Sequence, residues 1–191
     1  MNTAKQILDV DVVILVGGLG TRLKSIIKDK PKCLAPVNGK PFIDILLDDL
    51  FSQGFGRIIL ATGYLSEQLE HHVKQRADAE YIISCESEPL GTGGAIKFAE
   101  NHFCSNQVLI LNGDSRIIFH FPSLFEFHKN YRADMSILLS TATKGADYGN
   151  VVLNVENRIT SFSEKPTKSN STCVNTGVYV INRTLLSSLK L

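Results

Sequence analysis

The sequence has little cysteine, almost no net charge and no long apolar run. Its four cysteines are scattered and include no Cys-x-x-Cys pair; they are Cys33, Cys85, Cys104 and Cys173. This spacing argues against a disulfide framework or a zinc site and predicts reduced, mostly buried thiols. The formal net charge of +1 argues against nucleic-acid binding through bulk electrostatics.

Features that direct a chain to or through a membrane are also missing. No apolar run approaches the roughly 20 residues that span a bilayer. The N-terminal residues show no basic stretch followed by an apolar segment and a small-residue cleavage site, as a signal peptide would. We therefore expect a cytoplasmic protein.

What the sequence does contain is a regular alternation of strand and helix patterns. In the first part, strands are expected at residues 12–16, 57–62, 80–84 and 107–111, and helices at residues 43–53, 66–75 and 95–101. This order predicts an α/β fold, a three-layer sandwich with a mostly parallel, Rossmann-like central sheet and right-handed crossovers.

The second part is richer in strands. A helix is expected at residues 122–131, strands at 135–141, 150–155, 158–163 and 173–181, and a further helix from 184. The chain has 191 residues and no repeat or flexible linker. We expect a single domain over residues 1–191, with halves at about 1–115 and 116–191.

The first candidate site is a glycine-rich loop directly after the strand at 12–16; it comprises Gly17, Gly18, Leu19, Gly20, Thr21 and Arg22. Glycines let backbone N–H groups approach an anion, and the guanidinium of Arg22 suits phosphate oxygens. Leu23 replaces the third glycine of a dinucleotide fingerprint, and no P-loop lysine follows. An ordinary turn is the alternative, but Arg22 favours phosphate binding.

Three more candidate clusters directly follow expected strands; they are residues 86–94, 112–114 and 164–166. In open α/β sheets, ligands bind at the carboxyl ends of the strands. Asp114 is a natural magnesium ligand, because hard cations prefer oxygen donors, although aspartate also caps turns. Glu86 could accept the adjacent N1–H and N2–H₂ donors of guanine or simply face solvent. Lys32 and Lys165 could bind phosphates or be ordinary surface lysines. No nucleophile constellation is visible, and phosphoryl-type transfer needs none.

Taken together, these motifs resemble those of the sugar-1-phosphate nucleotidyltransferase family. The family signature GG-x-GTR-L followed by PK-x-x-x-P corresponds to residues 17–23 and 31–36. Later motifs follow in the family's order, at residues 88–95, 111–115, 148–149, 164–166 and 175–177. Within the family, residues 32–42, 63–64 and 86–95 most resemble D-glycero-D-manno-heptose 1-phosphate guanylyltransferases. The resemblance covers essentially the whole chain and implies a GT-A-like fold.

The resemblance implies transfer of a nucleotidyl group, GMP from GTP, to a sugar 1-phosphate, with release of pyrophosphate. The product would be an activated heptose for a cell-surface glycan. Arg22 and Lys32 would be the catalytic residues, and Asp114 would ligate Mg²⁺. Nucleotide binding is implied for Gly17, Gly18, Leu19, Gly20, Thr21, Glu86, Gly91 and Thr92. Sugar-phosphate binding is implied for Asn112, Gly149, Glu164, Lys165 and Asn175.

The implied partners are GTP, or another nucleoside triphosphate, and a sugar 1-phosphate, with no nucleic acid or membrane. Whether the chain forms a homo-oligomer stays open.

Uridylyl- and thymidylyltransferases of the family usually carry glutamine at the position of Glu86. The amide of glutamine suits uracil or thymine, whereas a carboxylate suits guanine. Family members also continue to a second metal-binding aspartate that these 191 residues do not include, and whether the chain is truncated or naturally short stays open. The missing aspartate favours a non-catalytic nucleotide-binding module as one alternative. UTP or dTTP as donor and mannose 1-phosphate as acceptor are the others. The missing third glycine argues against an NAD-binding domain.

Overall fold

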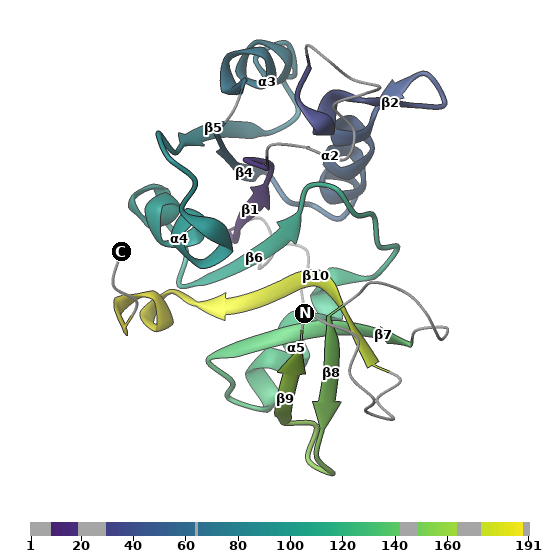
Figure 1. Cartoon of the computed structure of the whole chain (residues 1–191), viewed down its shortest axis with the longest axis vertical. Coiled ribbons are helices and arrows are strands. Elements are labelled where there is room, and N and C mark those ends of the chain that lie inside the picture. Colours follow the sequence, from purple (N-terminus) through teal and green to yellow (C-terminus); the bar gives the residue numbers. More distant parts are fainter. Residues whose placement is uncertain (1–8, 19–29, 64, 142–148, 164–172, 189–191) are drawn as a thin grey trace.

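The computed structural model describes residues 9–18, 30–63, 65–141, 149–163 and 173–188. Within these residues, eight strands form one sheet in the order β5-β4-β1-β6-β10-β8-β9, with β7 paired to β10 (Figure 1). The strands are β1 (Asp11–Leu15), β4 (Arg57–Thr62), β5 (Glu80–Cys85), β6 (Gln107–Asn112), β7 (Met135–Thr141), β8 (Asn150–Leu153), β9 (Ile159–Ser163) and β10 (Cys173–Asn182). A separate small hairpin consists of β2 (Pro36–Val37) and β3 (Lys40–Pro41).

The strands β5, β4, β1 and β6 run parallel to one another. Leu15 of β1 pairs with Ala61 on one side and with Asn112 on the other, so these strands end at the same edge of the sheet. Side chains alternate between the two faces: Val12 belongs to one core cluster and Val13 to the other. Because both faces are covered, the interior of β1 is continuously apolar.

Helices cover both faces of this sheet. The helices α2 (Phe42–Ser52), α3 (Ser66–Val73) and α5 (Phe121–Asn130) bury side chains in one cluster, and α4 (Gly91–Ala99) does so in the other. Short 3₁₀ helices are η2 (Lys32–Leu34), η3 (Glu100–His102) and η4 (Arg183–Ser188). No helix in the described ranges is long and apolar enough to cross a membrane. The predicted three-layer α/β arrangement is confirmed.

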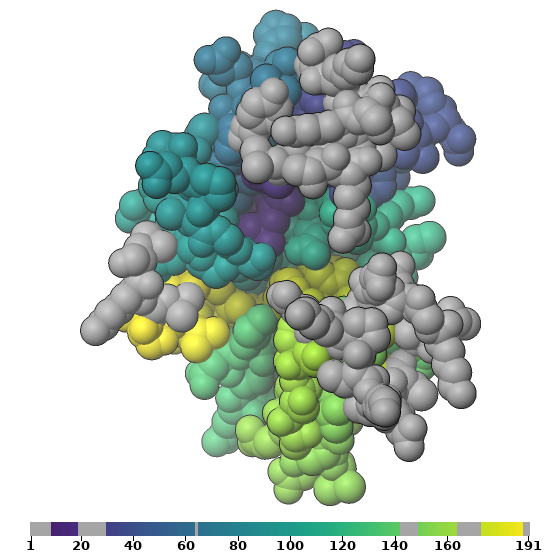
Figure 2. All heavy atoms as spheres, in the orientation of Figure 1, coloured from purple at the N-terminus to yellow at the C-terminus, as the bar shows by residue number. Residues whose placement is uncertain are grey.

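The long strand β10 joins the parallel half to the strand-rich half. Residues 178–182 pair antiparallel with β6, whereas Cys173 and Val174 pair with β8; β7 runs along the other edge of β10. The predicted hairpin is present as β8 and β9. In Figure 2, β10 (yellow) forms a band between the elements of the first half (purple to teal) and those of the second (green).

Three local predictions differ from the structure. The helix α4 begins at Gly91 rather than at residue 95, so the glycine-rich segment forms its first turn. Leu65, not Ser66, occupies the N-cap position of α3, and no side chain caps that helix. The segment expected to begin a helix at 184 is the 3₁₀ helix η4.

The prediction of mostly buried cysteines is wrong. Only Cys33 is buried, whereas Cys85 and Cys104 are exposed and Cys173 is partly covered. Cys85 is the last residue of β5 and Cys104 follows η3, so both lie where the chain leaves the core. Burial raises the pKa of the Cys33 thiol to about 11, which keeps it protonated and unreactive at neutral pH.

Candidate active site

The candidate site lies at the edge where the parallel strands end. Gly17 and Gly18 follow β1, Glu86 follows β5, and Asp114 follows β6 two residues after Asn112. The backbone N–H of Glu86 donates to the carbonyl of Thr62 at 2.9 Å, which extends the β4–β5 ladder by one step. Sheet pairing thus brings together residues that are far apart in the sequence, at the edge where open α/β sheets bind ligands.

The Glu86 carboxylate lies directly against the glycine-rich loop. A Cβ atom added to Gly17 would stand 3.2 Å from Glu86 Oε1, and one added to Gly63 would stand 3.5 Å from Glu86 Cγ. By contrast, a Cβ at Gly18 would have no atom of the described residues within 4 Å. The structure therefore joins two elements that the sequence assigned separately to nucleotide binding. Gly63 belongs to a segment that carried the family resemblance, but sequence reasoning assigned it no role in the site.

Glu86 also faces the start of α4. Its Oε2 atom accepts a hydrogen bond from the backbone N–H of Leu90 at 3.3 Å, just before the exposed Gly91 and Thr92 of the first helical turn. Among the described residues, Oε1 has no hydrogen-bond donor. One oxygen of this half-buried carboxylate is thus without a partner in the part of the chain that the structure describes.

Lys32 and Asp114 form an ion pair across the site, with Lys32 Nζ 2.8 Å from Asp114 Oδ2. Burial alone would raise the pKa of the Asp114 carboxyl, but the hydrogen bond and charge of Lys32 and a hydrogen bond from Ser115 outweigh it and lower that pKa. Asp114 is consequently ionised at neutral pH. The side chain of Lys32 is 39% exposed and that of Asp114 is 49% exposed, so a ligand can reach both.

Asp114 fits a hard cation that takes most of its ligands from elsewhere. Within the described part of the chain, no three His, Cys, Asp or Glu side chains are grouped so as to hold a metal ion. A protein site for Mg²⁺ commonly has only one or two carboxylates, with substrate phosphates and water completing the octahedron. The half-exposed, ionised carboxylate of Asp114 suits that kind of shared site.

Asn112 and Gly177 meet where the parallel half adjoins β10. A Cβ atom at Gly177 would lie 2.4 Å from Asn112 Nδ2, and Gly177 has a φ of +77°, so only glycine fits. The amide of Asn112, at the end of β6, therefore packs directly on the backbone of β10. This brings the two halves of the chain into contact beside Asp114.

Asn175 and Gly149, both assigned to sugar binding by the resemblance, lie next to each other, and the backbone N–H of Asn175 donates to the Gly149 carbonyl at 2.9 Å. Its side chain, however, is engaged within the protein. Asn175 Nδ2 donates to the Tyr179 hydroxyl at 2.7 Å, and Oδ1 accepts the backbone N–H of Gly177 at 2.9 Å. No signal in the sequence pointed to Tyr179. The other predicted residues, Leu19, Gly20, Thr21, Arg22, Glu164 and Lys165, lie outside the described residues.

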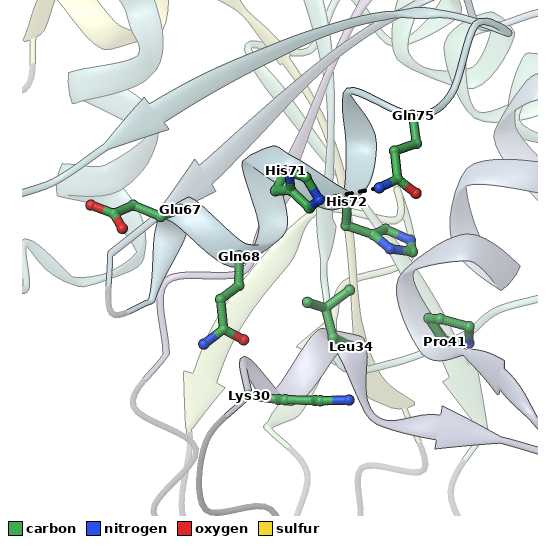
Figure 3. Close-up of a pocket in the computed structure, with 8 residues that line it drawn as sticks. All are labelled: Lys30, Leu34, Pro41, Glu67, Gln68, His71, His72 and Gln75. Carbon is green, nitrogen blue, oxygen red and sulfur yellow. Dashed lines mark hydrogen bonds between the residues drawn. The ribbon is translucent and has the colours of Figure 1, made fainter.

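A cavity of about 450 Å³ lies beside this site without containing it (Figure 3). Its lining comes from α3 and from the segment around η2: Lys30, Leu34, Pro41, Glu67, Gln68, His71, His72 and Gln75. None of the predicted site residues that the structure describes is among them, although Lys30 and Leu34 flank Lys32 in the sequence. In Figure 3 the carboxylate of Glu67 points away from the other side chains. The site is thus an open edge of the sheet rather than this cavity.

Comparison with known proteins gives one family match, nucleotidyl transferase, over residues 11–190. D-glycero-alpha-D-manno-heptose 1-phosphate guanylyltransferase from Aneurinibacillus thermoaerophilus is 38% identical over 176 residues, 92% of this chain and 76% of that protein. The protein of the same name from Campylobacter jejuni is 36% identical over 94% of this chain and 79% of its own length.

A solved structure is similar over nearly the same extent. HddC from Yersinia pseudotuberculosis, crystallised in complex with GMP-PN, superposes with a TM-score of 0.84 and 31% sequence identity. The match covers 95% of this chain and 80% of that one.

Proposed function

The chain belongs to the nucleotidyl transferase family, and from this premise we propose that it transfers GMP from GTP to a heptose 1-phosphate. The products would be pyrophosphate and a GDP-heptose, an activated sugar for cell-surface glycan synthesis. The names of the similar heptose 1-phosphate guanylyltransferases and the GMP-PN complex of HddC support the choice of donor and acceptor.

The observation that carries the choice of guanine is the position of Glu86 Oε1, which lies against Gly17. Guanine presents N1–H and N2–H₂ side by side, and an ionised carboxylate offers acceptors only. A base bound over Gly17 would meet the Oε1 atom, which lies against that glycine and has no donor among the described residues. Uracil and thymine present an acceptor beside the donor at the same edge, which a carboxylate repels.

In the proposed reaction, a phosphate oxygen of the sugar 1-phosphate attacks the α-phosphorus of GTP in line. The bond from that phosphorus to the oxygen bridging the β-phosphate breaks, and pyrophosphate leaves with the electron pair. Lys32, together with Arg22 of the glycine-rich loop, would neutralise the triphosphate charge. Mg²⁺ held by Asp114 and the phosphates would supply Lewis-acid charge stabilisation. Lys32 would exchange its present partner, Asp114, for a phosphate oxygen.

Sugar recognition is proposed for Asn112, Gly149, Glu164, Lys165 and Asn175. The contact of Asn112 with the backbone of Gly177 supports this placement, because it puts a polar side chain beside Asp114 at the boundary of the two halves. Asn112 can offer both a donor and an acceptor to a sugar hydroxyl.

The test is pyrophosphate release with each of GTP, UTP and dTTP against heptose 1-phosphate and mannose 1-phosphate, in Mg²⁺ and in EDTA. We expect release with GTP and heptose 1-phosphate that EDTA abolishes. Release only with mannose 1-phosphate or with UTP would correct the acceptor or the base. Tight binding without turnover at high Mg²⁺ would instead favour a non-catalytic module.

Glu86→Gln tests the base assignment. Losing the carboxylate should lower the GTP-over-UTP preference in kcat/KM by about 10- to 100-fold, because a charged hydrogen bond contributes about 1.5–3 kcal/mol. Glu88→Gln, at an exposed acid two residues away, is the matched control and should leave the preference unchanged. Equal selectivity in both variants would refute the role given to Glu86.

A further inference from the structure

The strand β10 contains an irregularity next to the candidate sugar site. Asn175 pairs with Leu139 of β7 and Tyr179 pairs with Ile137, so β10 advances four residues while β7 advances two. Val178 already pairs regularly with Leu111 of β6. The extra residues therefore form a bulge at positions 175–178, which is a local deviation that needs its own stabilising contacts.

Three side-chain hydrogen bonds close this bulge. Asn175 Oδ1 accepts the N–H of Gly177 at 2.9 Å, and Thr176 Oγ1 donates to the carbonyl of Leu138 at 2.7 Å. Asn175 Nδ2 donates to the hydroxyl of Tyr179 at 2.7 Å. The ring of Tyr179 packs against the second core cluster, so its hydroxyl is a fixed anchor for the Asn175 amide.

The bulge in turn determines where Gly177 lies. With a φ of +77°, Gly177 presses its backbone against the whole side chain of Asn112, and an added Cβ would be 2.4 to 2.9 Å from three of its atoms. Within the described residues, the Asn112 amide has no hydrogen-bond partner, so this contact is what limits its orientation. An amide that is packed against the backbone on one side is held in position to bind a ligand on the other.

We propose that Tyr179 is a positioning residue for the sugar 1-phosphate: its hydroxyl holds Asn175, Asn175 shapes the bulge, and the bulge sets Gly177 against Asn112. This inference rests on the proposed function. It gives Asn175 a second role beside its predicted place in the sugar pocket, because both ends of its amide already have partners inside the protein.

Tyr179→Phe is the least disruptive test, because it removes one hydroxyl and keeps the ring in the core. We expect KM for heptose 1-phosphate to rise about three- to tenfold, the value of one hydrogen bond, with KM for GTP changed by less than about twofold. The matched control is Tyr81→Phe, since the Tyr81 hydroxyl also bonds to side chains of the protein, Asp78 and Arg76, but lies on β5 near its start, away from the site. The control should move neither KM.

A double-mutant cycle separates positioning from a general loss of stability. If Tyr179 acts through Asn112, Tyr179→Phe raises KM for heptose 1-phosphate in the native background and has no further effect in an Asn112→Ala background. An equal rise in both backgrounds, or an equal rise in both KM values, would overturn the proposal.

A second readout does not depend on turnover. The side-chain ¹⁵N–¹H signals of Asn112, identified by their loss in Asn112→Ala, should shift in Tyr179→Phe and stay unchanged in Tyr81→Phe. Unmoved Asn112 signals would refute the positioning role. Absence of any pyrophosphate release would refute the proposed function, whereas the signals of Asn112 would still decide the role of Tyr179.

Discussion

At the scale of single residues, close backbone packing shapes the candidate site as much as its polar groups do. Gly113 lies between Asn112 and Asp114, and its N–H donates to the Leu15 carbonyl at 2.9 Å. An added Cβ would lie 2.3 Å from Val16 Cγ1 and 2.8 Å from the Leu15 oxygen. Any side chain at position 113 would therefore push the end of β6 away from β1 and displace both polar neighbours.

We predict that Gly113→Ala lowers the free energy of unfolding by about 1–3 kcal/mol, the usual cost of forcing an atom into a packed interior. Urea denaturation with an unchanged m-value would measure it. Gly56→Ala is the control, because a Cβ there meets nothing within 4 Å. Native-like stability of Gly113→Ala would show that the Val16 side chain moves aside without cost.

At the scale of elements, β1 is held at the end opposite the site by a buried carboxylate. Asp11 is 1% exposed and pairs with Arg57 of β4. It also accepts the backbone N–H groups of Cys104 and Ser105, each at 2.7 Å, and the Ser105 hydroxyl at 2.9 Å. These bonds tie the start of β1 to β4 and to the loop before β6, so they stabilise the order of the parallel strands.

This cluster predicts a pH dependence of stability. Burial would raise the pKa of the Asp11 carboxyl, but the hydrogen bonds from Ser105, Arg57 and Cys104 together lower it below its ordinary value. The folded state therefore binds this proton less readily than the unfolded state. Its contribution is complete above the unfolded pKa of about 3.9 and is lost as the pH falls toward the lower folded pKa.

We expect Asp11→Asn to cost about 3–5 kcal/mol at pH 7, because it leaves Arg57 facing a neutral group in a buried setting. The loss should stay constant down to about pH 4 and shrink below it, in denaturation curves recorded from pH 7 downward. Glu80→Gln removes the exposed partner of Arg57, whose side chain is 60% exposed, and should cost less than about 1 kcal/mol. If Asp11→Asn lowered the free energy of unfolding by the same amount at every pH, the lowered pKa of the Asp11 carboxyl would be contradicted.

At the scale of the whole molecule, the site draws on strands from both halves of the sheet. The end of β6 supplies Asn112 and Asp114, and β10 packs Gly177 against the first of them. Ligands that contact both halves should therefore stabilise the fold as one unit, because anything that binds only the native state raises its apparent stability.

We predict that GMP-PN with Mg²⁺, at about 100 times its dissociation constant, adds about 2.7 kcal/mol to the free energy of unfolding. For a chain of this length, that corresponds to a rise in Tm of about 5–10 °C. Scanning fluorimetry would measure the rise in Tm for the native protein and for Glu86→Gln. A UTP analogue at the same concentration as GMP-PN is the control ligand. An equal rise with both nucleotides would argue against guanine selectivity.

The sequence by itself determined the order of elements and the places where polar clusters follow strands. Residues 57–62 and 135–141 are strands with the predicted bounds, because a run of apolar and β-branched residues carries its signal locally. The parallel first half followed from the alternation of strands and helices. The family was also readable from the motifs and is confirmed by the match over residues 11–190.

Only the tertiary structure decided which side chains meet. Lys32 and Asp114 are 82 residues apart, and Glu86 reaches Gly17 only because β4 lies between β1 and β5 in the sheet. The engagement of Asn175 by Tyr179 depends on a bulge that leaves no periodic trace in the sequence. Periodicity reports whether a residue is buried within its own element, whereas contacts between elements depend on strand order and register, which the packing of the whole chain selects.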